Sequence, residues 1–304
     1  MHKIIPHLWF DSQAEDAVKL YTSLFDQSSV GDVVRYGKAG FEIHGQPEGK
    51  VMTVAFSLAG QDFMALNGGP YFKFTPAISF LIACETKEEV DRLWKELSAG
   101  GQTLMELGEY PFSSHYGWTA DRFGLSWQVM LMGDHPIRQK ITPTMLFVGD
   151  QYGKAEDAMQ FYTAVFHGTG ISDIDRYGAN EKPDQEGAVR HAQFALKGQV
   201  FAAMDSAYQH QFSFNEAISL MIMCQTQEEI DYYWDKLNQG GDPKAQQCGW
   251  LKDQFGISWQ VAPSLLQDML KSADQAQVER VTTTFLQMKK FDLAKLKQAY
   301  EGKA

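Results

Sequence analysis

An internal repeat constrains this chain more than any other feature of its sequence. The segment PHLWF followed by AEDAVKLYTSLF, at Pro6 to Phe25, returns as PTMLF followed by AEDAMQFYTAVF at Pro143 to Phe166. The closing motif YGWTADRFGLSWQV, at Tyr116 to Val129, returns as CGWLKDQFGISWQV at Cys248 to Val261. Two copies of the same motifs in the same order predict two copies of one fold.

Each copy divides again into two similar halves. A short apolar strand leads to a helix in which Ala14, Val18 and Tyr21 recur at helical spacing, and three strand-like runs follow. The order starts again at AISFLIAC, where Thr86 and Glu89 have the spacing of a helix-capping box. We therefore expect an α+β fold with two βαβββ units per module. Pairing two units covers their open sheet edges and curls them into a half-barrel, giving a cavity in one or both modules.

The repeat also sets the expected boundaries. We expect a first module at residues 1–132, a second at 141–262, and a C-terminal helical tail at 263–304. The second copy is about eight residues shorter just before its closing motif, and loops tolerate such losses. The tail carries apolar residues at helical spacing and has no counterpart after the first copy. We interpret its apolar residues as packing on the sheets, with binding to another protein as the alternative.

Composition excludes several classes of partner. The chain has 304 residues and a net charge of -11, from 27 basic and 38 acidic residues, and this charge repels nucleic acid and anionic lipid. It shows neither a signal peptide nor an apolar run of roughly 18 residues that could span a membrane, so we expect a cytoplasmic protein. Three cysteines without a CxxC pair predict reduced thiols rather than disulfides or a zinc site.

Several motifs together resemble the PhnB-like family. These are PHLWFD, the AEDA helix ending in YTSLF, the RYG at Arg35, and GWLKDQFGISWQV. That family belongs to the glyoxalase, or vicinal oxygen chelate, superfamily. The resemblance implies tandem glyoxalase-like modules whose active relatives hold a divalent metal that polarises a substrate. Members also carry the label 3-demethylubiquinone-9 3-methyltransferase. The chain lacks the Gly-rich turn of an S-adenosylmethionine-binding domain, so we do not predict methyl transfer.

The resemblance makes His7 and Gln128 the candidate metal ligands of the first module. Their counterparts in the second are Thr144 and Gln260. Neutral amides and hydroxyls are weak partners for a hard dication, so we predict a degenerate site, with a bound divalent metal as the alternative cofactor. The competing interpretation of His7 is a histidine satisfied by hydrogen bonds. That of the glutamines is a buried amide bridging neighbouring strands.

A larger set of side chains is expected to line the cavity. Asp205 is either a general base with a raised pKa, the partner of Arg176 or Arg190, or a turn residue. Tryptophans in strands fill cores more often than they stack on ligands. The cavity candidates are His7, Trp9, Asn67, Trp127, Gln128, Asp205, Trp259 and Gln260.

Three functional hypotheses follow. The first is a protein that binds a small-molecule ligand in a half-barrel cavity, without nucleic acid or membrane as partners. The second is a metal-dependent lyase, isomerase, transferase or dioxygenase that uses His7 and Gln128. The third is a scaffold whose tail binds another protein. Because single-module relatives generally form dimers, we expect the two modules to form an intramolecular pseudo-dimer, and the chain to be a monomer or weak homodimer.

Overall fold

The first copy of the repeat folds into two successive βαβββ units. The structure, a computed structural model, describes residues 4–134, 136–168 and 170–303. The first unit consists of β1 (Ile4–Phe10), α1 (Ala14–Leu24), β2 (Ser29–Arg35), the short helix α2 (Phe41–His44), β3 (Val51–Leu58) and β4 (Gln61–Asn67). The second consists of β5 (Ile78–Cys84), α3 (Lys87–Ser98), β6 (Gln102–Tyr110), β7 (Ser113–Ala120) and β8 (Ser126–Leu131). The predicted cap of α3 is confirmed, because the Thr86 hydroxyl accepts a hydrogen bond from the Glu89 amide at 3.2 Å.

In its described residues, the second copy repeats this order with one strand fewer. Its first unit consists of β9 (Ile141–Phe147), the 3-10 turn η1 (Gly149–Gln151), α4 (Ala155–Val165), β10 (Gly170–Arg176), β11 (Val189–Leu196) and β12 (Gln199–Asp205). Its second unit consists of β13 (Ile218–Cys224), α5 (Gln227–Leu237), the 3-10 turn η2 (Pro243–Ala245), β14 (Trp250–Lys252) and β15 (Ser258–Pro263). Within the described residues, two strands rather than the predicted three follow α5. The residues lost from this copy are those that form much of β6 and its turn into β7.

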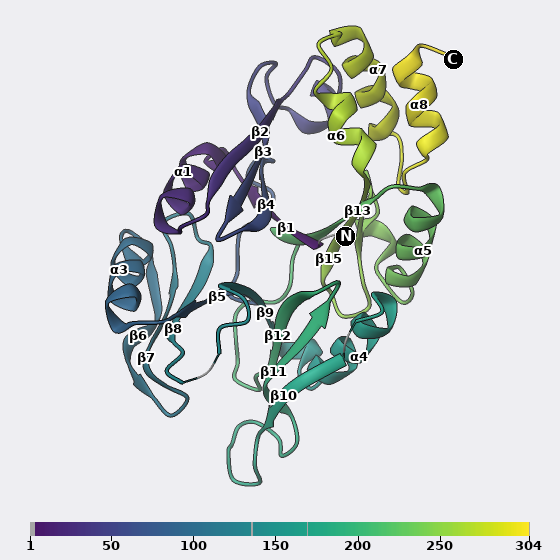
Figure 1. The fold of residues 1–304 in the computed structure, drawn as a ribbon. Helices are drawn as coiled ribbons and strands as arrows, with labels where there is room; N and C mark the ends of the chain where they lie inside the picture. Colours follow the sequence, from purple (N-terminus) through teal and green to yellow (C-terminus); the bar gives the residue numbers. More distant parts are fainter. Residues whose placement is uncertain (1–3, 135, 169, 304) are drawn as a thin grey trace.

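Two mixed sheets organise the chain. In the described part of the chain, sheet A has seven strands in the order β14-β15-β13-β1-β4-β3-β2. Sheet B has eight in the order β10-β11-β12-β9-β5-β8-β7-β6. Helices α1 and α3 lie on one side of the molecule and α4 and α5 on the other, with strands between them (Figure 1). The predicted α+β class is confirmed.

Each sheet combines one unit from each copy of the repeat. In sheet A, β1 of the first copy runs antiparallel to β13 of the second, and His7 pairs with Ser219. In sheet B, β5 runs antiparallel to β9, and Ser79 pairs with Thr144. We expected the two units of one module to pair with each other. This expectation is wrong, because each unit pairs with a unit of the other copy. Each sheet needs both copies, because β1 and β5 complete their ladders on strands of the other copy.

One face of each sheet carries the helices and the hydrophobic core. In β1, Ile4, Leu8 and Phe10 are buried in the core, on the face where α1 packs against β3 and β4. Successive side chains of a strand point to opposite faces, so His7 and Trp9 lie on the other face. We call this second face, opposite the helices, the inner face of each sheet.

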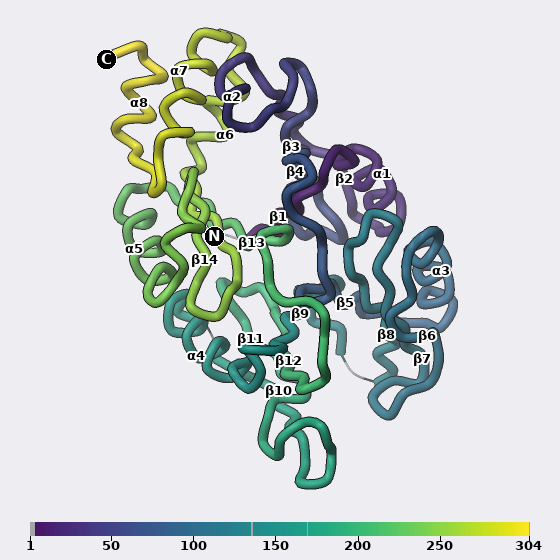
Figure 2. The backbone as a smooth tube through the Cα atoms, turned by 180° about the vertical axis from the view of Figure 1, so that it is seen from behind, coloured from purple at the N-terminus to yellow at the C-terminus, as the bar shows by residue number. Residues whose placement is uncertain are grey.

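The tail packs on the end of the second copy. It forms α6 (Ser264–Leu270), α7 (Gln275–Leu286) and α8 (Leu293–Glu301), and Val281 and Leu296 are fully buried. The amide of Cys248 donates to the Met288 carbonyl at 2.8 Å, so the tail pairs with the turn where this copy is short. The α6 and α7 helices lie beside α2 at one end of the molecule (Figure 2), where Lys271 forms a 2.7 Å ion pair with Asp32. This agrees with the interpretation that the apolar residues of the tail pack on the body.

Among the helices of the described residues, none combines the length and apolar character needed to cross a bilayer.

Candidate functional site

The inner face of sheet A brings one histidine, one glutamine and two serines together. His7 on β1 pairs with Ser219 on β13, and β13 continues the ladder to β15, which carries Ser258 and Gln260. The Gln260 Nε2 donates to the Ser219 Oγ at 2.8 Å. All four side chains are buried. They therefore form a polar row across the middle strands of the sheet.

Two buried polar atoms of this row lack a hydrogen-bond partner among the described residues. The His7 Nδ1 and the Ser258 Oγ are both buried and unpaired. The Gln260 Oε1 also accepts no hydrogen bond from the described residues, but it is not enclosed as the other two atoms are. A buried polar atom without a partner costs about 1–3 kcal/mol. Unpaired atoms in one place therefore lower the stability of the folded protein. A ligand that forms hydrogen bonds with them restores that free energy.

Burial keeps the imidazole of His7 neutral. It lowers the pKa of His7 from its usual 6.5 to about 3, because a charged imidazole loses its solvation there. At neutral pH the ring then offers one N–H donor and one lone-pair acceptor. It can form hydrogen bonds to a ligand, but it carries no positive charge to attract an anion.

Aromatic and thioether side chains surround the polar row. The ring of Trp250 lies edge-on to the ring of His7, with 5.5 Å between their centroids. The centroids of the Trp250 and Trp9 rings are 6.0 Å apart. The Trp9 indole is fixed by its 2.8 Å hydrogen bond to the Gly69 carbonyl. Met64 on β4 is the ladder partner of His7. The row of polar atoms is thus framed by large apolar groups, a pattern that ligand sites in proteins share.

The same positions on the inner face of sheet B are closed by hydrogen bonds. There the Gln128 Nε2 donates to the Ser79 Oγ at 2.8 Å, and the Tyr116 hydroxyl donates to the Gln128 Oε1 at 2.7 Å. The Trp118 Nε1 donates to the Ser126 Oγ at 2.7 Å. The counterpart of His7 is Thr144, whose hydroxyl donates to a backbone carbonyl. Sheet B therefore keeps its polar row as internal structure.

One sequence difference explains why the two glutamines differ. The residue of the second copy that aligns with Tyr116 is Cys248, whose thiol contacts the Phe285 carbonyl of the tail at 3.6 Å. No phenol is then present to donate to Gln260. Comparison of the two closing motifs could have revealed this difference from sequence. The predicted cavity set also missed Ser258 and Trp250, which motif comparison does not single out because Ser126 and Trp118 stand at the same positions of the first copy.

The structure contradicts the cavity prediction for Asn67 and Asp205. The Asn67 Oδ1 accepts from the Ala14 amide at 2.9 Å, at the start of α1. The Asp205 carboxylate accepts from the amides of Gly153, Ala155 and Val189 at 2.8, 3.3 and 3.0 Å. Both side chains therefore fix the start of a helix against a strand end. Burial raises the pKa of Asp205, and its direct partners are backbone amides rather than either predicted arginine.

Trp127 and Trp259 are also wrongly placed by the cavity prediction. Both are fully buried on the helix-covered face. There the ring centroids of Tyr21, on α1, and Trp127 are 5.2 Å apart. Each indole donates to an aspartate, Trp127 to Asp121 at 2.9 Å and Trp259 to Asp253 at 2.8 Å. Burial raises the pKa of Asp253 to about 6. These residues form the same structural network in both copies.

The candidate metal ligands do not meet in one sheet. His7 lies in sheet A, whereas Gln128 lies in sheet B, because each sheet draws on both copies. The glutamine that shares a sheet with His7 is Gln260. Nowhere in the described part of the chain do three His, Cys, Asp or Glu side chains gather to hold a metal. One imidazole, one amide and hydroxyls do not fit a divalent cation, which needs carboxylate or several imidazole ligands.

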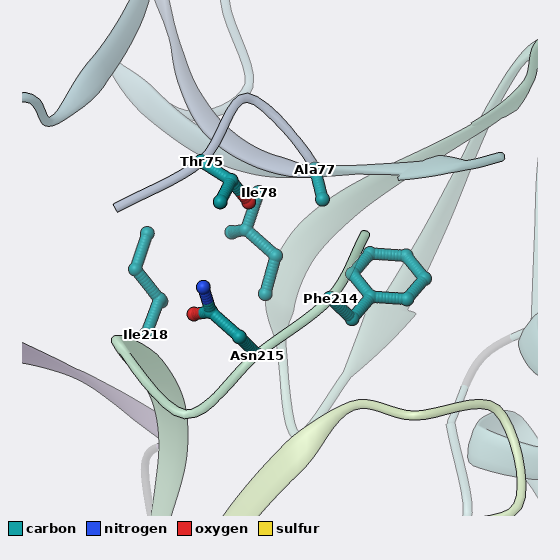
Figure 3. Close-up of a pocket in the computed structure, with 6 residues that line it drawn as sticks. All are labelled: Thr75, Ala77, Ile78, Phe214, Asn215 and Ile218. Atoms are coloured by element: carbon teal, nitrogen blue, oxygen red, sulfur yellow. The ribbon is translucent and has the colours of Figure 1, made fainter. Parts of the chain in front are cut away.

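A small hollow lies where the two copies meet. It is lined by Thr75, Ala77 and Ile78 from the first copy and by Phe214, Asn215 and Ile218 from the second (Figure 3). Its volume of about 10 Å³ holds roughly one water molecule. The Asn215 Nδ2 donates to the Lys73 carbonyl at 2.8 Å beside it. The hollow is therefore part of the joint between the copies and is too small for a substrate.

Comparisons with known proteins agree with this architecture. The sequence model of the 3-demethylubiquinone-9 3-methyltransferase family matches residues 2–130 and 139–262. Among solved structures, the PhnB protein from Bacillus cereus is 43% identical over 42% of this chain and 98% of its own, with a TM-score of 0.39. Glyoxalase I from Zea mays is 11% identical over 89% of this chain and 95% of its own, with a TM-score of 0.51, and shares the fold. No curated protein sequence matched.

Proposed function

Because the chain belongs to the 3-demethylubiquinone-9 3-methyltransferase family, in the glyoxalase and vicinal oxygen chelate superfamily, we propose that it binds a small uncharged molecule on the inner face of sheet A. The observation that carries this proposal is the pair of buried, unpaired atoms His7 Nδ1 and Ser258 Oγ, beside the Gln260 Oε1, which accepts no hydrogen bond from the described residues. The equivalent atoms of sheet B are paired. A ligand is the simplest reason to keep such atoms unpaired in one sheet only.

The surroundings define the chemistry of this ligand. The Gln260 Oε1 is an acceptor, so the ligand carries an N–H or O–H group directed at it. The apolar body of the ligand packs against Trp9 and Trp250, which suits an aromatic ring. Burial of a charge beside a neutral, desolvated His7 is costly, so the ligand is uncharged. Phenol, indole and benzamide are minimal probes with these properties.

Metal-assisted chemistry and methyl transfer find less support. The metal-dependent alternative needs ligands that the row of His7, Ser219 and Gln260 does not supply. The family name points to methyl transfer. The described chain, however, consists of two sheets built across a repeat, whereas a Rossmann domain has an open parallel sheet with helices on both faces. We propose binding as the function, with His7 as the group that positions the ligand.

Matched variants in the two sheets test the proposal. Binding of phenol, indole and benzamide is measured by ligand-observed NMR and by the rise in unfolding temperature, since a ligand at 100 times its Kd stabilises by about 2.7 kcal/mol. We expect His7→Ala and Gln260→Ala to abolish binding. The control variants Thr144→Ala and Gln128→Ala, at the same positions of sheet B, should retain it. Absence of binding by all three probes, or equal loss in both sets of variants, would contradict the proposal.

A further inference from the structure

A cleft lies among loops of the second copy that adjoin strands of sheet B. It is bounded by the turn η1 before α4, the segment around Pro183, and the residues 207–211 that follow β12. Its volume of about 440 Å³ falls within the range of small-molecule sites, roughly 300–1,000 Å³. Its lining residues all lie outside the strands, and the proposed function makes no use of it.

Two of the loops that form this cleft are longer in the second copy than in the first. Three residues separate Phe10 from Ala14, whereas seven separate Phe147 from Ala155. Ten residues separate Asn67 from Ile78, whereas twelve separate Asp205 from Ile218. The cleft residues Tyr152 and Tyr208 lie within these longer loops, in or next to the additional residues. The cleft therefore comes from insertions specific to this copy.

Hydrogen bonds hold the three loops in one arrangement. The Gln185 amide donates to the Tyr152 hydroxyl at 2.7 Å, which joins the first loop to the second. The Ala207 amide donates to the buried Asp184 carboxylate at 2.7 Å, which joins the second to the third. Because these bonds exist before any ligand arrives, binding would cost little loop ordering.

Within the third loop, a histidine is fixed with one ring nitrogen against a serine. The His210 Nε2 lies 2.9 Å from the Ser206 Oγ, and its ring packs on Phe212 with 4.8 Å between centroids. Burial lowers the pKa of His210, which keeps the imidazole neutral at physiological pH. The ring is therefore held in a defined orientation at the cleft.

The lining specifies the chemical class of the ligand. The polar groups are the phenols of Tyr152 and Tyr208, the imidazole of His210, and the amides of Gln185, Gln209 and Gln211. Lysine and arginine are absent from the residues that line the cleft, so anions such as phosphates are not favoured. Amides bond well to hydroxyl groups because they both donate and accept. Tyr208 is 60% exposed, and its ring offers a flat apolar surface beside them.

We propose that this cleft binds a neutral saccharide, with Tyr208 packing on a sugar ring and His210 and the glutamine amides bonding to its hydroxyl groups. Aromatic packing combined with amide hydrogen bonding suits a ligand that has both an apolar face and many hydroxyls. Hydrocarbon ligands would leave the amides unpaired, at a cost for each.

Saturation-transfer NMR on the full chain tests the proposal. The probes are methyl glucopyranoside, maltose, cellobiose and N-acetylglucosamine, with choline as a cationic probe and glucose 6-phosphate as an anionic probe. We expect at least one neutral sugar to bind, and Tyr208→Ala and His210→Ala each to weaken that binding about tenfold. Tyr71→Ala removes an exposed tyrosine from the corresponding loop of the first copy and should leave binding unchanged.

Three outcomes would overturn the proposal. The first is that none of the four sugars binds at millimolar concentration. The second is that choline or glucose 6-phosphate binds while the sugars do not, which would assign the cleft to a charged ligand. The third is sugar binding that persists in both Tyr208→Ala and His210→Ala, which would place the sugar elsewhere. His7→Ala leaves the cleft intact, so loss of binding on sheet A does not affect this result.

Discussion

The inner faces of sheets A and B show how one repeated pattern can serve two purposes. Both carry a glutamine that donates to a serine on the neighbouring strand at 2.8 Å. In sheet B the Tyr116 phenol completes the row. In sheet A the aligned residue is Cys248, and a histidine replaces Thr144. Two substitutions thus accompany the change from a closed structural network to a row with unpaired atoms, while the helix-covered faces stay alike.

The largest expected effect is a loss of stability at Asp253 and Asp121, and it tests whether the helix-covered faces of the two copies are alike. The Asp253 carboxylate accepts from the Tyr162 hydroxyl, the Trp259 indole and the Phe255 amide at 2.7, 2.8 and 2.9 Å, and Asp121 plays the same part in the first copy. In an asparagine, the side-chain NH2 group would face donors that the carboxylate now accepts from. Asp253→Asn and Asp121→Asn should therefore each lower the free energy of unfolding by about 3 kcal/mol. Urea denaturation measures both. A large difference between the two would show that the copies do not share this network.

The second prediction concerns acid stability and separates the inner faces. The pKa of His7 is about 3 in the folded protein and near 6.5 in the unfolded chain, so the unfolded chain binds a proton first as the pH falls. Stability is then lost below pH 6.5, by about 2 kcal/mol at pH 5.

The variant His7→Gln should lose this acid sensitivity, and Thr144→Ala in sheet B should keep it. Comparison of each variant with the wild type over pH 5–8 cancels other groups, including Asp253, whose raised pKa acts in the opposite direction. Identical pH slopes for the wild type and His7→Gln would show that His7 is solvated.

The third prediction compares the two glutamines. Gln128→Ala leaves both the Tyr116 hydroxyl and the Ser79 hydroxyl without their partner, so we expect a loss of about 2 kcal/mol. Gln260→Ala removes one hydrogen bond, to Ser219, and should cost about 1 kcal/mol. Chemical denaturation of both variants measures the difference. A greater cost for Gln260→Ala would indicate that its Oε1 is paired in solution.

The smallest effect comes from making sheet B resemble sheet A. Tyr116→Phe removes the phenol that donates to the Gln128 Oε1 and should cost about 1 kcal/mol. If an unpaired amide oxygen attracts ligands, this variant should also gain weak binding of phenol, measured by ligand-observed NMR. Tyr110→Phe, on the neighbouring strand, serves as the control. A variant as stable as the wild type would mean that this hydrogen bond contributes nothing.

Most of the architecture followed from the repeat, whereas the site did not. The repeated motifs predicted the units, the cap at Thr86 and the class of fold, because helix and strand periods are local properties of the sequence. Which units pair is a long-range property, so His7 and Gln128 were assigned to one site although they lie in different sheets. Trp127 and Asp205 were misplaced for a related reason. The face that a strand residue occupies depends on register, and a polar residue at a strand end can fix a helix start instead of lining a cavity.

The central claim is that sheet A offers a ligand site and sheet B does not. A crystal structure of the protein soaked with phenol and indole tests it most directly. We predict density for the probe within hydrogen-bond distance of the Gln260 Oε1 and beside His7, with Trp9 or Trp250 packed on its ring. Probe density between Gln128 and Ser79 in sheet B, with none beside His7, would contradict the claim.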